Sequence, residues 1–349
     1  MRIVTLIEDN PGREGCCHEH GLCFYIETRL HTLLMDTGAS GAFLENARTL
    51  GIDVGQVDTV VLSHGHYDHT GGVMPFARIN DRAAIYLNRN AGGDYYSIRE
   101  TGNTYIGIDR EILKLPQMRL VDGELRIDEE LSLFSGITGG RFRAKSNERL
   151  LQRDGESFVR DVFDHEQCLV IEENGMHVLL SGCAHNGILN ILDRYEDLYG
   201  ALPDVVISGF HLIQKQGYAP EDIAVIEETA RELHQTGILF YTGHCTGQEP
   251  YQIMKSIMGD RLEPLRVGEE IRLAGVMCRN PRRAEEELQA AGTETHQRPI
   301  HSEEELQAAG TEERHRPQHA AEKPGTAKTH QRTMHTKKEP SCVEQEARP

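Results

Sequence analysis

One short polar segment constrains this chain more than any other. Residues 63–72 carry three histidines and one aspartate within six positions. They directly follow residues 57–62, a β-branched and mostly apolar run that predicts a buried strand. Imidazole and carboxylate are ligands that suit zinc, iron and manganese. So many ligands in one loop favour two metal ions held side by side, although a histidine-rich surface loop is the plain alternative.

The order of residues within this loop suggests how the ligands divide. Gly65 separates the first two histidines and allows the chain to turn between them. We therefore expect His64 and His66 to face one ion. Asp68 and His69 follow around the turn and are expected to face a second ion. Four ligands are too few for two catalytic metals, so others should lie further along the chain.

The same order of apolar strand, turn and histidine recurs three more times. Residues 176–181 lead to His185, residues 205–208 lead to His211, and residues 238–241 lead to His244. A single histidine after a strand is more often a hydrogen-bonded structural residue than a ligand. Because strand ends line one edge of a sheet, four such histidines favour convergence on one site.

These motifs resemble a known family. Residues 64–69 resemble the HxHxDH signature of the metallo-β-lactamase superfamily, and residues 33–38 resemble its first motif, a strand that ends in Asp36. Residues 181–190, 208–212 and 244–247 resemble one subgroup, which includes the dihydropterin–ribofuranosylaminobenzene phosphate synthase of methanopterin biosynthesis. The resemblance covers residues 1–278. It implies an α/β fold of the αββα type, a four-layer sandwich.

The resemblance also implies a ligand set and supporting roles. It assigns the first metal to His64, His66 and His185, and the second to Asp68, His69 and His244. Asp36 would brace the loop that carries the first ligands.

The turn at residues 182–185 departs from the family pattern. Most of the superfamily has an aspartate there that bridges both ions, whereas this chain has Cys183 and His185. Either residue could take the bridging place, or one ion alone could bind tightly. His165 is a weaker candidate ligand, and its expected role is to begin a strand at residues 168–171.

Metal-dependent hydrolysis is the chemistry expected from this set, with a metal-bound hydroxide as the nucleophile. We expect two divalent ions, zinc first, with manganese or iron as alternatives. Asp68 would orient water, and His211 would donate to a substrate oxygen as charge develops. The structural alternative for His211 is a strand-end histidine bonded to the backbone.

The expected substrate is a small molecule, a phosphoester or another small phosphorylated compound. The first alternative is a dihydropterin-type synthase that uses the same metals. The second is a di-iron oxidoreductase, although neither a flavin domain nor a second bridging carboxylate is evident. A non-catalytic protein with a structural metal ranks last, because structural zinc sites are usually thiolate-rich.

Composition narrows the classes further. The net charge of −18 argues against a general nucleic-acid-binding surface, which would need basic residues to neutralise phosphates. No apolar run approaches the length that spans a bilayer, and the first residues are charged too early for a signal peptide. We therefore expect a cytoplasmic protein whose eight cysteines form no disulfides. Residues 16–23 predict a loop near the site entrance, with a separate zinc or redox site as the alternative.

The remaining segments complete the expected organisation. Helices are predicted at residues 41–50, 186–198 and 220–235. Residues 91–120 suggest a loop, either a surface excursion or a flap over the metals. Residues 136–142 suggest a weak phosphate-binding turn or a hairpin end. Residues 1–278 would form one metallo-β-lactamase-like domain, and residues 279–349 a low-complexity, disordered tail with a duplicated ten-residue segment.

Overall fold

Two seven-stranded sheets lie face to face at the centre of this protein, whose computed structural model describes residues 1–273. The first sheet has the order β18-β1-β2-β3-β4-β5-β8. Its strands are β1 (Arg2–Ile7), β2 (Cys23–Glu27), β3 (Thr32–Met35), β4 (Thr59–Leu62), β5 (Ala84–Asn88), β8 (Met118–Val121) and β18 (Glu270–Arg272). The prediction of a disordered tail at residues 279–349 lies outside the described residues.

The second sheet has the order β17-β16-β15-β14-β13-β10-β9. Its strands are β9 (Leu125–Arg126), β10 (Leu131–Phe134), β13 (Cys168–Glu173), β14 (Met176–Leu180), β15 (Val205–Ile207), β16 (Leu239–Thr242) and β17 (Leu262–Pro264). Strands β3, β4, β5 and β8 are parallel in the first sheet, as are β14, β15, β16 and β17 in the second. Parallel neighbours bring their carboxyl ends to the same edge of each sheet.

Alternation along the buried strands separates the layers. In β4, Val61 packs between the two sheets, whereas Val60 and Leu62 pack against the helices outside the first sheet. In β14, Val178 faces the other sheet and Leu179 faces the outer helices. Fully burying one such side chain contributes roughly 1.5–3 kcal/mol. This alternation requires apolar cover on both faces of each sheet.

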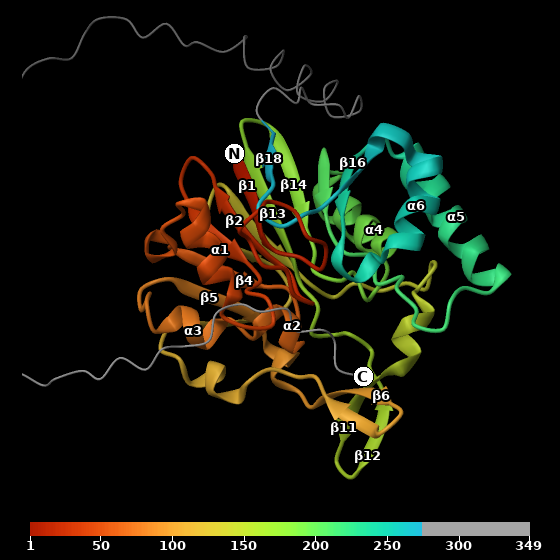
Figure 1. The fold of residues 1–349 in the computed structure, drawn as a ribbon, viewed down its shortest axis with the longest axis horizontal. Helices are drawn as coiled ribbons and strands as arrows, with labels where there is room; N and C mark the ends of the chain where they lie inside the picture. Colours follow the sequence, from red (N-terminus) through yellow and green to blue (C-terminus); the bar gives the residue numbers. More distant parts are fainter. Residues whose placement is uncertain (274–349) are drawn as a thin grey trace, which may run out of the picture. The chain divides into compact units, whose positions relative to one another are not determined.

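Helices supply that cover. Figure 1 shows α1 and α3 beside the first sheet, and α4, α5 and α6 beside the second. The α-helices are α1 (Ala42–Leu50), α2 (Tyr67–Thr70), α3 (Val73–Ala77), α4 (Ile188–Tyr199), α5 (Pro220–Gln235) and α6 (Gln248–Met258). The short 3-10 helices are η1 (Val54–Gln56), η2 (Arg89–Gly92), η3 (Arg110–Lys114), η4 (Lys145–Arg149), η5 (His244–Thr246) and η6 (Gly259–Arg261). The predicted four-layer αββα sandwich is confirmed.

The prediction of a loop at residues 91–120 is wrong for much of its length. This region contains β6 (Tyr95–Arg99), β7 (Gly102–Tyr105) and the edge strand β8. With β11 (Leu150–Asp154) and β12 (Ser157–Arg160), strands β6 and β7 form a separate sheet that projects at the bottom of Figure 1. Tyrosine and threonine favour strands, but β6 pairs with β11, more than fifty residues away in the sequence.

Residues 136–142 form neither a hairpin end nor a free anion-binding turn. The segment follows β10 without regular structure. The Arg141 guanidinium lies 2.8 Å from Asp193 Oδ1 and also contacts Glu232. Two carboxylates therefore neutralise the residue that suggested phosphate binding. Gly136 and Gly139 have positive φ angles of 71° and 116° along this irregular connection from β10 to η4.

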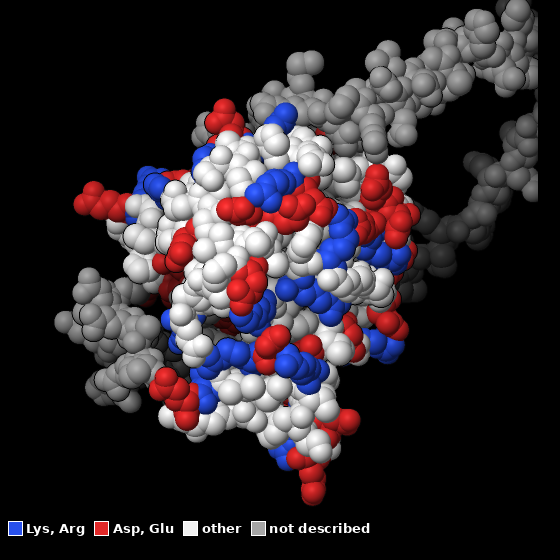
Figure 2. All heavy atoms as spheres, turned by 90° about the vertical axis from the view of Figure 1, so that its right-hand side faces the viewer, with Lys and Arg blue, Asp and Glu red and all other residues white. Residues whose placement is uncertain are grey.

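Surface charge and helix hydropathy bear on the expected absence of nucleic-acid and membrane partners. Figure 2 shows basic and acidic side chains mixed over the face that carries α5 and α6. A mixed surface of this kind lacks the continuous basic stripe that nucleic acids favour. Among residues 1–273, no helix is both long enough and apolar enough to cross a membrane.

Candidate metal centre

The predicted site residues converge at the carboxyl ends of the parallel strands. His64 follows β4, His185 follows β14, and His211 and His244 follow β15 and β16. Three residues at these ends have a left-handed backbone: Ala184 (φ 50°), His211 (φ 49°) and His244 (φ 48°). Such strained conformations persist where the surroundings hold them, and they often occur at functional sites. Here they turn the chain sharply after each strand.

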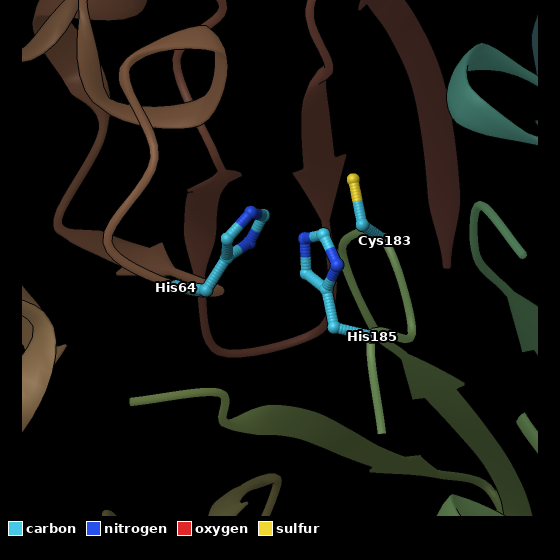
Figure 3. Close-up of side chains that lie close together, drawn as sticks. All are labelled: His64, Cys183 and His185. Atoms are coloured by element: carbon cyan, nitrogen blue, oxygen red, sulfur yellow. The ribbon is translucent and has the colours of Figure 1, made fainter. Parts of the chain in front are cut away.

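The first cluster contains three buried imidazoles. His64 Nε2 lies 3.0 Å from His66 Nδ1, and the His185 ring centroid is 4.9 Å from the centroid of each of these rings. His185 Nε2 has no hydrogen-bond partner. Figure 3 shows His64 facing His185 across the gap between the two sheets. His64 and His185 share one donor group with Cys183, whereas His66 falls in a group with Asp161 and His165.

Asp36 and Ser63 fix the orientation of the first loop. Asp36 accepts hydrogen bonds from the Ser63 amide (2.7 Å) and the Ser63 hydroxyl (2.8 Å). Since the hydroxyl proton is used there, Ser63 Oγ accepts from His64 Nδ1 at 2.8 Å. This leaves His64 Nε2 as the unprotonated nitrogen, which faces the cluster. A Cβ on Gly182 would lie only 2.2 Å from Ser63 Oγ, so glycine permits the close approach of the opposite turn.

His185 is held by residues of η4 and of the loop before β13. Asn147 accepts from His185 Nδ1 at 3.0 Å and donates to the His185 carbonyl at 2.7 Å. The Phe163 ring stacks on the imidazole with a centroid distance of 4.5 Å and an interplanar angle of 2°. The buried Glu166 accepts from the His185 amide at 2.7 Å. Together these contacts hold His185 Nε2 toward the cluster.

A second cluster contains Asp68, His69 and His244. His69 Nδ1 donates to Asp36 Oδ2 at 2.6 Å, so its Nε2 is the nitrogen turned toward the site, where it faces Cys183 Sγ. His244 Nδ1 donates to Asp9 Oδ1 at 2.6 Å, and its unpartnered Nε2 lies 3.5 Å from Asp68 Oδ2. In both clusters, His64, His69, His185 and His244 are therefore each held at one ring nitrogen by a polar side chain.

Cys183 lies between the clusters. Its Sγ is 3.1 Å from His69 Nε2, and its side chain is 2% exposed. The sulfur falls within one donor group with His64 and His185, and within another with His69 and His244. In each group all ligand atoms lie within 4.8 Å of one another. The thiol is thus common to both sets of donors.

Comparisons with known proteins identify the family. The model of the metallo-beta-lactamase superfamily matches residues 19–207, more than half of the chain. The chain belongs to the metallo-beta-lactamase superfamily. A solved structure of a metal-dependent hydrolase of the beta-lactamase superfamily is 28% identical, with a TM-score of 0.66, and the match covers 78% of this chain and 99% of that one.

Two curated relatives of this superfamily member come from Methanocaldococcus jannaschii. An uncharacterized protein is 29% identical over 221 residues, which are 60% of this chain and 80% of the relative. The second is the 7,8-dihydropterin-6-methyl-4-(beta-D-ribofuranosyl)-aminobenzene-5'-phosphate synthase. It is 27% identical over 298 residues, which are 78% of this chain and 96% of the relative.

The electrostatics of this superfamily member suit cations. Burial lowers the pKa of His64 and His185 well below the usual value, and that of His66 to about 3. These imidazoles are therefore neutral, the form that binds metal. Burial opposes ionisation of Asp68, but His69 and His244 hold its pKa well below the usual range. A carboxylate then faces the second cluster.

The residues present fit bound metal. Nitrogens 3.0 Å apart, as in His64 and His66, suit a common ion that each would contact at about 2.0–2.1 Å. The buried Nε2 atoms of His185 and His244 have no hydrogen-bond partner, which also supports metal binding, because a buried polar atom normally has a partner. Second-sphere acceptors on the outward nitrogens are typical of histidines that bind metals.

Several important residues escaped sequence analysis. Residues 16–22 form a loop at the site and Cys23 begins β2; in this loop His20 lies 2.8 Å from Asp9 Oδ2 and 3.4 Å from Asp68 Oδ2. Asp9, Asn147 and Glu166 also received no role, since their contacts depend on tertiary pairing. The signal for Asp9 was available, because Asp9 follows the apolar residues of β1 as Asp36 follows those of β3.

His165, the weaker candidate ligand, has both ring nitrogens occupied. Its Nδ1 accepts from the Gly65 amide at 3.0 Å, and its Nε2 donates to Asp161 Oδ2 at 3.2 Å. It therefore supports the first loop from behind, and β13 begins after it at Cys168. Asp161 Oδ2 is also 4.0 Å from His66 Nε2, the outward nitrogen of that ring.

His211 lies beside the first cluster. Its ring centroid is 4.2 Å from that of His185, and its Nδ1 is buried without a partner. The His211 amide donates to Cys245 Sγ at 3.3 Å. The hydrogen bond to Cys245 therefore uses the backbone of His211, and ring atom Nδ1 remains available to the site.

Proposed function

We propose that this protein is a metal-dependent hydrolase with two divalent ions and a small phosphorylated substrate. The first ion would be held by His64, His66 and His185, and the second by Asp68, His69 and His244. One observation carries the proposal: four buried imidazoles, those of His64, His69, His185 and His244, are each hydrogen-bonded at one nitrogen to a neighbouring polar side chain, and each offers a ligand atom to a donor group that contains Cys183. Such orientation is expected of a metal site.

The chemistry divides between the ions and the side chains. When bound, divalent ions supply Lewis acidity and lower the pKa of coordinated water to roughly 7. Asp68 would orient the attacking water with its carboxylate. His211 would donate from its ring to a substrate oxygen as negative charge develops there.

Arg143 supports an anionic substrate. It is exposed, and its guanidinium donates to the neutral Asn186 Oδ1 at 3.0 Å, next to His185. The neighbouring Arg141 and Lys145 instead pair with carboxylates. Within residues 1–273, no carboxylate lies within ion-pair distance of Arg143. Its charge is therefore available to a phosphoryl group.

An assay with aryl phosphomonoesters and phosphodiesters tests the proposal. The zinc- or manganese-loaded protein should release the aryl alcohol, and Arg143→Gln should raise KM by roughly tenfold with little change in kcat. Arg141→Gln is the matched control, since its charge is already neutralised, and it should leave KM unchanged. No turnover of either ester class by the metal-loaded protein would contradict hydrolysis of phosphoesters.

The second candidate function is that of the named relative. Similarity to the synthase spans 96% of that protein, which favours a synthase activity at the same metals. Incubation with the precursors of 7,8-dihydropterin-6-methyl-4-(beta-D-ribofuranosyl)-aminobenzene-5'-phosphate, followed by mass spectrometry, separates the two candidates. Formation of that product without ester hydrolysis would favour the synthase.

A further inference from the structure

Cys183 occupies a place that the proposed function leaves unassigned. We infer that its sulfur is the ligand shared by both ions, so that the centre is bridged by a thiolate and prefers zinc, cobalt or iron to manganese or magnesium. This inference rests on the two-metal site proposed above. Soft sulfur ligands favour the first group of metals, whereas carboxylate and water ligands suit the second.

The position of the sulfur is the first support. Cys183 Sγ shares one donor group with His64 and His185 and another with His69 and His244. Its closest contact is His69 Nε2 at 3.1 Å. Two buried nitrogens in these groups, His185 Nε2 and His244 Nε2, have no hydrogen-bond partner. The sulfur therefore lies among unpaired donors from both clusters.

The number of lone pairs excludes His185 as the bridge. Each imidazole nitrogen offers a single lone pair, and His185 Nδ1 is already bound to Asn147. His185 can therefore bind one ion only. A thiolate sulfur has several lone pairs and can bind two ions at once. The choice between Cys183 and His185 in the turn after β14 thus falls on Cys183.

No carboxylate competes for the shared place. Among residues 1–273, none of the three donor groups that contain Cys183 includes an aspartate or a glutamate. Asp36 is used by Ser63 and His69, and Asp68 lies toward His244 and His20. The position that a bridging carboxylate would fill is therefore occupied by sulfur.

Cys245 is the other thiol nearby, and it is held differently. Its Sγ accepts from the His211 amide at 3.3 Å and lies 3.8 Å from the Cys183 carbonyl oxygen. Its donor group contains Cys183 and His211, but none of the five proposed histidine ligands. Cys245 therefore lies behind the shared sulfur and serves as a matched control.

Binding of a metal to Cys183 requires only loss of the thiol proton. The S–H bond breaks, its electron pair remains on sulfur and forms the bond to the metal, and the proton passes to water. Thiolate ligation gives Co²⁺ a sulfur-to-metal charge-transfer absorption in the near ultraviolet, which nitrogen and oxygen ligands do not produce. This absorption reports on the ligand independently of any enzymatic activity.

The test is titration of the metal-free full chain with Co²⁺, followed by absorption spectroscopy. Wild type should develop the charge-transfer absorption, and Cys245→Ser should keep it. Cys183→Asp should bind two equivalents of cobalt without it, because aspartate can bridge through oxygen. If the absorption is missing from wild type, persists in Cys183→Asp or disappears only in Cys245→Ser, the inference is wrong.

Metal competition adds a second readout. Cys183→Asp should shift the ratio of zinc to manganese affinity toward manganese by roughly tenfold or more. An unchanged ratio would contradict a bridging thiolate. Failure of the hydrolase proposal can be distinguished from failure of the thiolate inference. In that case the charge-transfer absorption would be present, but phosphoesters would remain intact.

Discussion

His31, which links the two sheets, is hydrogen-bonded at both ring nitrogens, whereas His185 and His244 at the candidate metal centre are each hydrogen-bonded at one. At the edge away from the metal centre, His31 places Nδ1 3.0 Å from Asp58 and Nε2 2.6 Å from Asp128. Both of its nitrogens are thus used, and the residue links the two sheets. At the other edge, His185 and His244 are each fixed at one nitrogen and leave the other buried and unpartnered.

This difference separates structural histidines from candidate ligands. Leaving a buried polar atom unpaired costs about 1–3 kcal/mol. Within residues 1–273, the buried ring nitrogens without a partner, those of His66, His185, His211 and His244, all lie at the metal-centre edge. Paired histidines such as His31 stabilise the sandwich on their own. The unpaired nitrogens contribute favourably only when something binds them. The predictions below compare matched changes at the two edges.

The largest effect is expected from Asp68. We expect Asp68→Ala to lower turnover by roughly 10²–10⁴-fold while the metal-free protein stays folded, because it removes a proposed ligand and the group that orients water. Steady-state kinetics and circular dichroism measure the two properties. Asp58→Ala at the opposite edge is the control, and it should lower stability with less than about twofold change in turnover. Equal loss of activity in both variants would remove the distinction between the edges.

Metal removal should weaken one edge alone. Zinc at 100 times its Kd would stabilise the native state by about 2.7 kcal/mol. Hydrogen exchange with and without zinc should therefore show lost protection at residues 181–187 and 243–247 after chelation. Residues 28–31 should exchange at the same rate in both samples. Uniform loss of protection would show that the metal supports the whole sandwich.

Asn147 should have an intermediate effect. Asn147→Leu removes the acceptor for His185 Nδ1, and we expect the affinity for zinc to fall by roughly 10–100-fold. Isothermal titration of the metal-free protein measures this change. Asn147→Asp keeps an acceptor oxygen and should retain most of the affinity. Similar losses in both variants would indicate damage to the segment rather than to the hydrogen bond.

The smallest effect is a pH-dependent change in stability at His31. Burial opposes protonation, but Asp58 and Asp128 together raise the pKa of His31 above its usual value. Its stabilising contribution should be complete below the unfolded pKa of about 6.5 and lost as pH rises through the higher folded value. His31→Asn should therefore cost at most about 1 kcal/mol, and only at the lower pH. Urea unfolding on both sides of this range measures it, and a larger cost at high pH would reverse the sign.

Sequence analysis predicted the features that depend on local residue patterns. Apolar strands followed by histidines gave the sheets and the residues at their ends, and α5 begins and ends at the predicted residues 220 and 235. The sheet formed by β6, β7, β11 and β12 was missed because its central pairing joins distant, partly exposed segments. Asn147 and His20 were missed for a similar reason. Each contacts the site through a residue distant in the sequence, so no short sequence motif predicts the contact.

Locating bound metal tests the central claim most directly. Anomalous diffraction from zinc-loaded crystals should show two peaks, one among His64, His66 and His185 and one among Asp68, His69 and His244. Peaks at other residues, or protein that remains free of metal in excess zinc, would contradict this account.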